Sequence, residues 1–189
     1  MKKILLTIVA ALLTISSFAQ EHMTFKGIPI DGSVRSMMSK LVDQGFEDCG
    51  MENGIGAMQG LFSGSEATIL IQPNQEGMVT RVVVAYDMQK CTWSIIKARY
   101  DNLVEGLTKK YGKPTEEIKE FSSVYTEGSG RELNGFFLGK NQLQTKWEVD
   151  TGAIGMMFMY NVNFPECILL VYEDKINAEI EEQQAYDDL

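Results

Sequence analysis

Two apolar runs, Val82-Val83-Val84-Ala85-Tyr86-Asp87 and Ile168-Leu169-Leu170-Val171-Tyr172-Glu173, decide the fold that we expect. Both consist of aliphatic residues followed by a tyrosine and a carboxylate. Short apolar runs rich in β-branched and aromatic residues are typical of buried strands. Their similar texture predicts that each run is the last strand of one half of a duplicated arrangement.

A helix is expected before each of these halves. The first follows Ser33, which is a favourable N-cap residue, and Gly45 stands where a left-handed C-terminal cap is expected. The second follows Thr92 and stops at Gly112. In the first helix the apolar residues recur at helical spacing on one face: Val34, Met37, Met38, Leu41 and Val42.

Three strands are expected after each helix. Turn residues separate the strands, such as Ser63-Gly64-Ser65 in the first half and Asp150-Thr151-Gly152 in the second. The expected strands cover residues 57–62, 67–72 and 79–87, then 143–149, 153–160 and 167–173. We therefore predict an α+β fold of two tandem helix-plus-antiparallel-three-strand units, with an insertion after the second helix. One helix on three strands buries one face of a sheet, and two such units share a larger core.

The first residues have the pattern of a cleavable secretory signal. Lys2 and Lys3 precede an apolar run over residues 4–15, and Ser17-Phe18-Ala19 supplies the small residues of a cleavage site. We predict a signal peptide over residues 1–19 and export to the periplasm or the exterior. No cysteine lies at the cleavage site, so a lipoprotein is not expected, and no later apolar run is long enough to span a membrane. Residues 20–189 are predicted to form one α+β domain, with sub-units at about 24–90 and 91–175 and an acidic tail at 176–189.

The charge of the chain restricts its partners. The formal net charge is −9, and removal of Lys2 and Lys3 makes it −11. An acidic protein repels phosphate backbones, so nucleic acid is not an expected partner. A basic partner or a cationic ligand remains compatible with this charge, and so does the ordinary solubility of an exported protein.

The three cysteines allow at most one intramolecular disulfide. Cys49, Cys91 and Cys167 offer three pairings, and their spacing does not select one of them. The alternative is three buried, reduced cysteines that pack as small hydrophobic residues.

No residue pattern indicates catalysis, a metal or a cofactor. His22 is the sole histidine and lies near the expected mature N-terminus, where chains are usually mobile. Glu47, Asp48 and Glu52 lie in a glycine-rich segment that does not have the EF-hand spacing, so a solvated acidic loop is expected rather than a calcium site. The glycine-rich segment 54–60 lacks the spacing and the lysine of a phosphate loop, and glycines that support turns and close strand contacts explain it better.

The methionines and tryptophans have two interpretations. Met156, Met157 and Met159 fall on both faces of one strand, and methionine-rich surfaces can be adaptable binding sites. Core filling is the simpler interpretation for them, and also for Trp93 and Trp147. We assign no catalytic, cofactor-binding or metal-binding residue from the sequence.

Three segments resemble a group of small exported bacterial proteins of uncharacterised function. They are a strand-to-helix entry over residues 25–32, the end of the second helix at Lys110-Tyr111-Gly112-Lys113-Pro114, and the ending Val171-Tyr172-Glu173-Asp174-Lys175-Ile176-Asn177. The order of elements is also similar to that of β-lactamase-inhibitor-protein-like folds. These motifs are structural, so the resemblance implies a fold and transfers no catalytic residue.

We therefore expect an exported, non-enzymatic module that binds a protein or a peptide in the cell envelope or outside it. Two alternatives stay open. One is a carboxylate-based hydrolase that acts on carbohydrate or peptide, and the other is a structural envelope component. A deep pocket with converging acids would favour the enzyme, whereas a flat apolar patch would favour binding.

Overall fold

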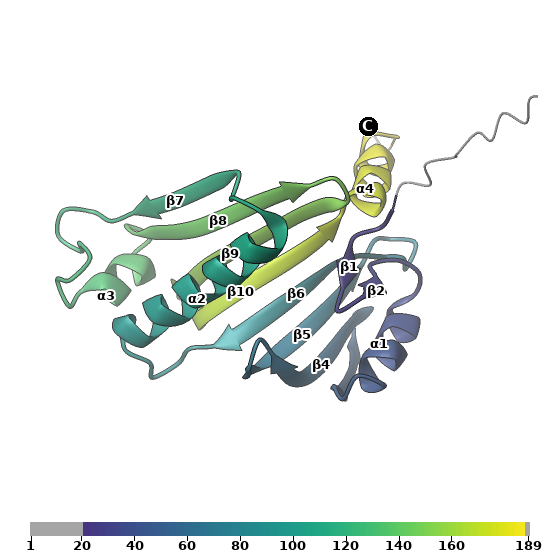
Figure 1. Ribbon diagram of the computed structural model, residues 1–189, viewed down its shortest axis with the longest axis horizontal. Coiled ribbons are helices and arrows are strands. Elements are labelled where there is room, and N and C mark those ends of the chain that lie inside the picture. Colours follow the sequence, from purple (N-terminus) through teal and green to yellow (C-terminus); the bar gives the residue numbers. More distant parts are fainter. Residues whose placement is uncertain (1–20, 188–189) are drawn as a thin grey trace, which may run out of the picture.

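The computed structural model describes residues 21–187, so the predicted signal peptide lies outside the described residues. Figure 1 shows a broad twisted sheet with helices against it. The helices are α1 (Val34–Val42), α2 (Trp93–Tyr111), α3 (Glu132–Phe137) and α4 (Lys175–Asp187). The strands before α2 are β1 (Thr24–Phe25), β2 (Ile28–Pro29), β3 (Glu47–Glu52), β4 (Ile55–Phe62), β5 (Ser65–Pro73) and β6 (Val79–Asp87). Those after it are β7 (Glu116–Glu120), β8 (Gln142–Val149), β9 (Gly152–Asn161) and β10 (Phe164–Asp174).

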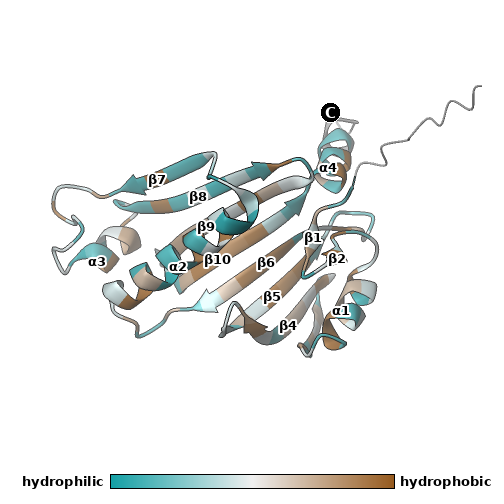
Figure 2. Cartoon of the chain, viewed as in Figure 1, coloured by the Kyte–Doolittle hydropathy of each residue, from teal (hydrophilic) through white to brown (hydrophobic). Residues whose placement is uncertain are grey.

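Eight of these strands form one antiparallel sheet in the order β3-β4-β5-β6-β10-β9-β8-β7. β6 and β10, which contain the two apolar runs, pair with each other at its centre, with Val83 opposite Val171 and Ala85 opposite Leu169. Apolar residues concentrate in β5, β6 and β10, whereas β7 and β8 are more hydrophilic (Figure 2). β1 and β2 form a separate two-stranded hairpin.

The predicted fold of two tandem three-stranded units is wrong. All strands from β3 to β10 belong to one continuous sheet, and four strands, not three, follow each of α1 and α2 along the chain. The segment predicted as an insertion after the second helix contributes β7 to the sheet edge and also contains α3. The six predicted strands are present, so the error concerns their number and their assembly.

The two strands of the large sheet that lie outside the predicted three-stranded units are its edges. β3 has the sequence EDCGME and all of its residues are exposed, and β7 has the sequence EEIKE with one half-buried residue, Ile118. Strands that bury so little have no apolar alternation. Natural sheets also carry charged residues on their edge strands, because these charges prevent pairing with other chains.

Helix α1 begins and ends as predicted. Ser33 is its N-cap, and its hydroxyl accepts a hydrogen bond from the backbone N–H of Ser36. Gly45 has a φ of 90°, the left-handed conformation that glycine favours. The helix packs on β4, where Gly56 lies under Val34 and Met38; a Cβ atom at Gly56 would lie 2.7 Å from the nearest atom of each. This glycine therefore lets the helix approach the strand closely.

Helix α2 also matches its prediction, with Thr92 as N-cap and Gly112 as C-cap. Its buried Tyr100 hydroxyl is 2.9 Å from the hydroxyl of Thr145 on β8 and donates to the backbone oxygen of Met156 on β9 at 3.3 Å. The indole N–H of Trp147 donates to the backbone oxygen of Gly112 at 3.2 Å. These polar contacts fix the helix on the second half of the sheet.

The helices α1, α2 and α3 lie on the same face of the sheet. One cross-strand row joins the two helices: it begins at Gly56 under α1 and ends at Trp147, whose indole N–H bonds to the end of α2. The residues between them in this row are Ile71, Val82, Tyr172 and Ile154. In Figure 1 the β1–β2 hairpin lies on this face between α1 and α2. Its Phe25 stacks on Phe62 at 5.2 Å between ring centroids.

Helix α4 stands at the end of the sheet and is tied to the beginning of the described chain. Asp174, fully buried, accepts hydrogen bonds from the backbone N–H groups of Met23 (2.6 Å) and Asn177 (2.9 Å). The Asn177 amide donates to the backbone oxygens of Ile30 and Val79, each at 3.0 Å. The helix therefore begins in a buried polar network, and the acidic tail is anchored at its start. Within residues 21–187, no helix is long and apolar enough to cross a membrane.

Candidate functional site

The face of the sheet opposite α1, α2 and α3 is a partly apolar surface, which we call the open face. Along β6, Val82, Val84 and Tyr86 point to the helices, so Val83 and Ala85 point to the open face. The strand register extends this face across the sheet through Leu70, Val83 and Val171, and through Ala85, Leu169 and Met157. Its aliphatic and sulfur-containing side chains are Ile55, Ala57, Leu61, Leu70, Val83, Ala85, Ile118, Ala153, Met157, Met159, Cys167, Leu169 and Val171.

Most of these open-face side chains are half-buried although no helix covers them. On a pleated sheet, neighbours on adjacent strands shield one another, so side chains of an uncovered face are often half-buried. Leu61, near the end of β4, is the exposed exception at 62%. A second layer on this face would bury them completely. The open face is thus a surface on which a partner could bury further apolar area.

The methionines of β9 divide between the two faces. Met156 is buried under α2, as the core-filling interpretation predicts, whereas Met157 and Met159 are half-buried on the open face. Trp147 is a core residue with 1% exposure. Trp93 is half-buried and packs against the rings of Phe121, Phe136 and Phe158.

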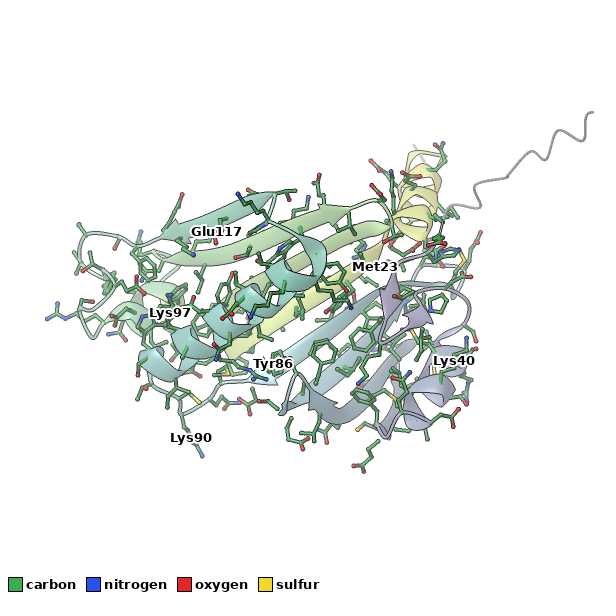
Figure 3. The ribbon with its side chains drawn as sticks, viewed as in Figure 1. Met23, Lys40, Tyr86, Lys90, Lys97 and Glu117 are labelled. Atoms are coloured by element: carbon green, nitrogen blue, oxygen red, sulfur yellow. The ribbon has the colours of Figure 1, made fainter. Side chains whose placement is uncertain are left out.

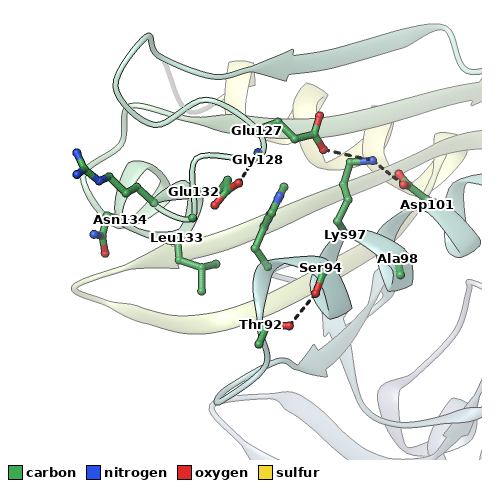
Figure 4. A pocket seen from close by; sticks show the side chains of 13 residues that line it. Thr92, Ser94, Lys97, Ala98, Asp101, Glu127, Gly128, Glu132, Leu133 and Asn134 are labelled. Atoms are coloured by element: carbon green, nitrogen blue, oxygen red, sulfur yellow. Dashed lines mark hydrogen bonds and ion pairs between the residues drawn. The ribbon is translucent and has the colours of Figure 1, made fainter.

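A hollow of about 840 Å³ lies between the start of α2 and the segment before α3. Figure 4 shows the ammonium group of Lys97 between the carboxylates of Asp101 and Glu127. Glu132 is buried and accepts a hydrogen bond from the backbone N–H of Gly128 at 2.6 Å. The acidic groups of this hollow are therefore engaged in ion pairs or in holding the loop.

The displaced pKa values of carboxyl groups within residues 21–187 belong to Glu105 and Glu148. A hydrogen bond from Lys109 lowers the pKa of Glu105, and one from Lys146 lowers the pKa of Glu148. Both carboxyl groups are on the surface and remain ionised at neutral pH. A general acid needs the opposite displacement, a raised pKa.

Tyrosines have raised pKa values for a structural reason. Burial raises the pKa of Tyr86 to about 12, against the opposing charge of Arg99. The Arg99 guanidinium lies 4.6 Å from the centre of the Tyr86 ring, and the Tyr86 hydroxyl donates to the backbone oxygen of Phe62. Figure 3 shows Tyr86 on the helix side of the sheet, near the end of β6. Burial also raises the pKa values of Tyr100 and Tyr172.

His22 is held by carboxylates. Its Nδ1 lies 3.0 Å from Oδ2 of Asp174, and its Nε2 lies 3.7 Å from Oδ2 of Asp31. Because Asp174 also accepts two backbone N–H groups, the cluster joins the start of the described chain to α4. The expectation of a mobile terminus missed this contact, since the histidine and its main partner are 152 positions apart in the sequence.

The three cysteines are free: Cys49 is exposed, Cys91 is half-buried and Cys167 is buried. Their interpretation as three buried hydrophobic residues is therefore wrong for Cys49, which lies on the exposed edge strand β3. Burial, followed by the charges of Asp87 and Glu166, raises the pKa of the Cys167 thiol.

The segments considered for metal and phosphate binding are both strands. Glu47, Asp48 and Glu52 belong to β3, and the described residues contain no cluster of three or more ligand side chains that could hold a metal ion. The glycine-rich segment forms β4, in which Gly60 lies against the ring of Phe46. Its glycines allow close packing of side chains from the α1 region.

Comparisons with known proteins do not identify a family for this chain. No protein-family model matches the chain, no curated protein sequence is significantly similar to it, and no solved structure matches it.

Proposed function

We propose that this chain is an exported, non-enzymatic module that binds a protein or a peptide on the open face of its sheet. The observation that carries the proposal is the uncovered pair of apolar rows through β5, β6, β10 and β9. An uncovered apolar patch on a monomer is more often an interaction site than a surface patch of average composition is. The proposed export rests on the predicted signal peptide, and the resemblance to small exported bacterial proteins is part of the same proposal.

The chemistry of the hollow near α2 also supports binding over hydrolysis. A carboxylate-based hydrolase needs two carboxyl groups that converge on a substrate with different protonation states. Here Asp101 and Glu127 both pair with Lys97, and Glu132 bonds to the backbone. The hydrolase alternative has no specific observation in its favour.

Site-specific photo-crosslinking in the cells that make the protein tests this proposal. A photoreactive phenylalanine derivative replaces Leu169 on the open face, and in a matched control it replaces Ile95, an exposed aliphatic residue on α2. We expect a crosslinked product of defined mass from position 169 and none from position 95. Equal products from both positions, or no product from position 169, would contradict the proposal.

A further inference from the structure

The charges on the open face are strongly unequal. The strand register assigns side chains to this face in steps of two, and both signs of charge occur among them. The carboxylates are Glu47, Glu52, Glu66, Asp87, Glu116, Glu120, Glu148 and Glu173, and the cations are Arg81 and Lys146. The apolar rows are therefore framed mainly by negative charge.

Both cations of the open face are already paired. Arg81 lies 3.4 Å from a carboxylate oxygen of Glu173 and 3.2 Å from one of Glu181 on α4. Lys146 lies 2.8 Å from a carboxylate oxygen of Glu148. These pairs lie toward the end of the sheet near α4. Lys146 also lies opposite Glu116 on β7, so the carboxylates that neither cation faces are those of Glu47, Glu52, Glu66, Asp87 and Glu120.

Glu66 and Asp87 are the clearest case at the opposite end of the face. Thr68 pairs with Ala85, and continuing this register by two residues brings Glu66 opposite Asp87. Both line one hollow of about 330 Å³ on this face. Like charges on opposite cross-strand positions are destabilising. In the described part of the chain, no basic side chain lies within ion-pair distance of either carboxylate.

The charge of Asp87 affects a neighbouring side chain. Cys167 on β10 lies opposite Asp87 on β6. Burial raises the pKa of the Cys167 thiol, and the charge of Asp87 raises it further. The end of the open face thus disfavours a further negative charge and favours a positive one.

We infer that the occupant of the open face is a cationic segment of a partner protein, with apolar side chains beside lysines or arginines. This inference rests on the proposed function. The apolar side chains would cover the rows through Val83, Val171 and Leu169, and the cations would reach the hollow of Glu66 and Asp87. Such a partner relieves the repulsion between these carboxylates and buries apolar area in the same contact.

A second copy of the chain is a worse fit for this surface. Face-to-face pairing would place one set of uncompensated carboxylates against another, in a chain whose formal net charge is −9. Like charges brought together across an interface cost free energy and suppress the wrong partner. The charge of the face therefore selects a basic partner over self-association.

Selection from a display library of short random peptides on the purified protein tests the inference. Counter-selection on the double variant Leu169→Thr/Val171→Thr removes peptides that do not need the apolar rows, without changing the charge. We expect the recovered peptides to be net positive. We also expect Glu66→Gln/Asp87→Asn to weaken their binding by about threefold to tenfold, as loss of two partly exposed ion pairs would. Asp43→Asn/Glu105→Gln, which removes two charges from helices on the other side, is the matched control and should change little.

The outcomes separate the two proposals. Neutral or acidic peptides that depend on Leu169 and Val171 would overturn the cationic partner and leave the binding function intact. Peptides that bind Glu66→Gln/Asp87→Asn as tightly as the control Asp43→Asn/Glu105→Gln would also overturn the cationic partner. No face-dependent peptide, together with no crosslink from position 169, would overturn both. A dimer in light scattering that the threonine variant dissociates would show a second copy as the occupant instead.

Discussion

Replacing Asp174 should cause one of the largest losses of stability available from a single polar residue in this chain. Its carboxylate is fully buried and accepts the backbone N–H groups of Met23 and Asn177, which are themselves buried. Asp174→Ala leaves both N–H donors without an acceptor. A buried donor without a partner costs about 1–3 kcal/mol, so the free energy of unfolding should fall by about 2–6 kcal/mol. Asp174→Asn keeps one acceptor oxygen and should lose about half of that amount.

Urea denaturation followed by circular dichroism measures these differences, and amide hydrogen exchange at Met23 and Asn177 locates them. Asp43→Ala is the control, because Asp43 ends α1 on the surface; its effect should stay within about 0.5 kcal/mol. If Asp174→Ala lowered the free energy of unfolding by less than about 1 kcal/mol, with both amides still protected, the network would not have the role derived for it.

Three further predictions concern packing, a buried hydroxyl and pH. Gly60→Ala places a Cβ atom 2.7 Å from a phenylalanine ring and should lower the free energy of unfolding by about 1–3 kcal/mol. Gly106→Ala meets open space in a helix and should raise the free energy of unfolding by about 0.5–1 kcal/mol. Thermal unfolding of both variants checks that the two effects have opposite signs. Tyr100→Phe leaves the buried Thr145 hydroxyl without its partner and should lower the free energy of unfolding by about 1–2 kcal/mol in urea. The pKa of Tyr86 is about 12 in the folded state and near 10 when unfolded, so its contribution to stability is complete below pH 10 and is lost as the pH rises toward 12. Urea midpoints between these pH values should fall less steeply for Tyr86→Phe, and an equal slope would contradict this assignment.

The elements with strong local signals were predictable from sequence. Ser33 and Gly45 bound α1, and Thr92 and Gly112 bound α2, because capping depends on residues adjacent in the chain. The six central strands bury one or both faces, so they keep an apolar pattern that a sequence displays. The exposed edge strands β3 and β7 bury almost nothing and left no such pattern, which is why the predicted units had three strands each.

The candidate site was less predictable. Net charge already permitted a basic partner, but the sequence does not indicate which face of the sheet the helices leave open. Glu66 and Asp87 are 21 positions apart (87 − 66), and they become neighbours only through the β5–β6 register. The division of Met156 and Met157 between core and surface likewise depends on which face receives α2.

The sequence by itself determined the boundaries of α1 and α2, the central strands and the acidic character of this protein, because each of these depends on local spacing or on composition. Only the tertiary structure decided that the two apolar runs pair with each other in a single sheet, that the helices gather on one face, and that Asp174 joins His22 and Met23 to α4. The physical reason is the same in each case. Distant strands pair, and polar groups are buried against distant backbone, because the free energy of the whole folded chain favours it. No short stretch of the sequence therefore indicates these contacts.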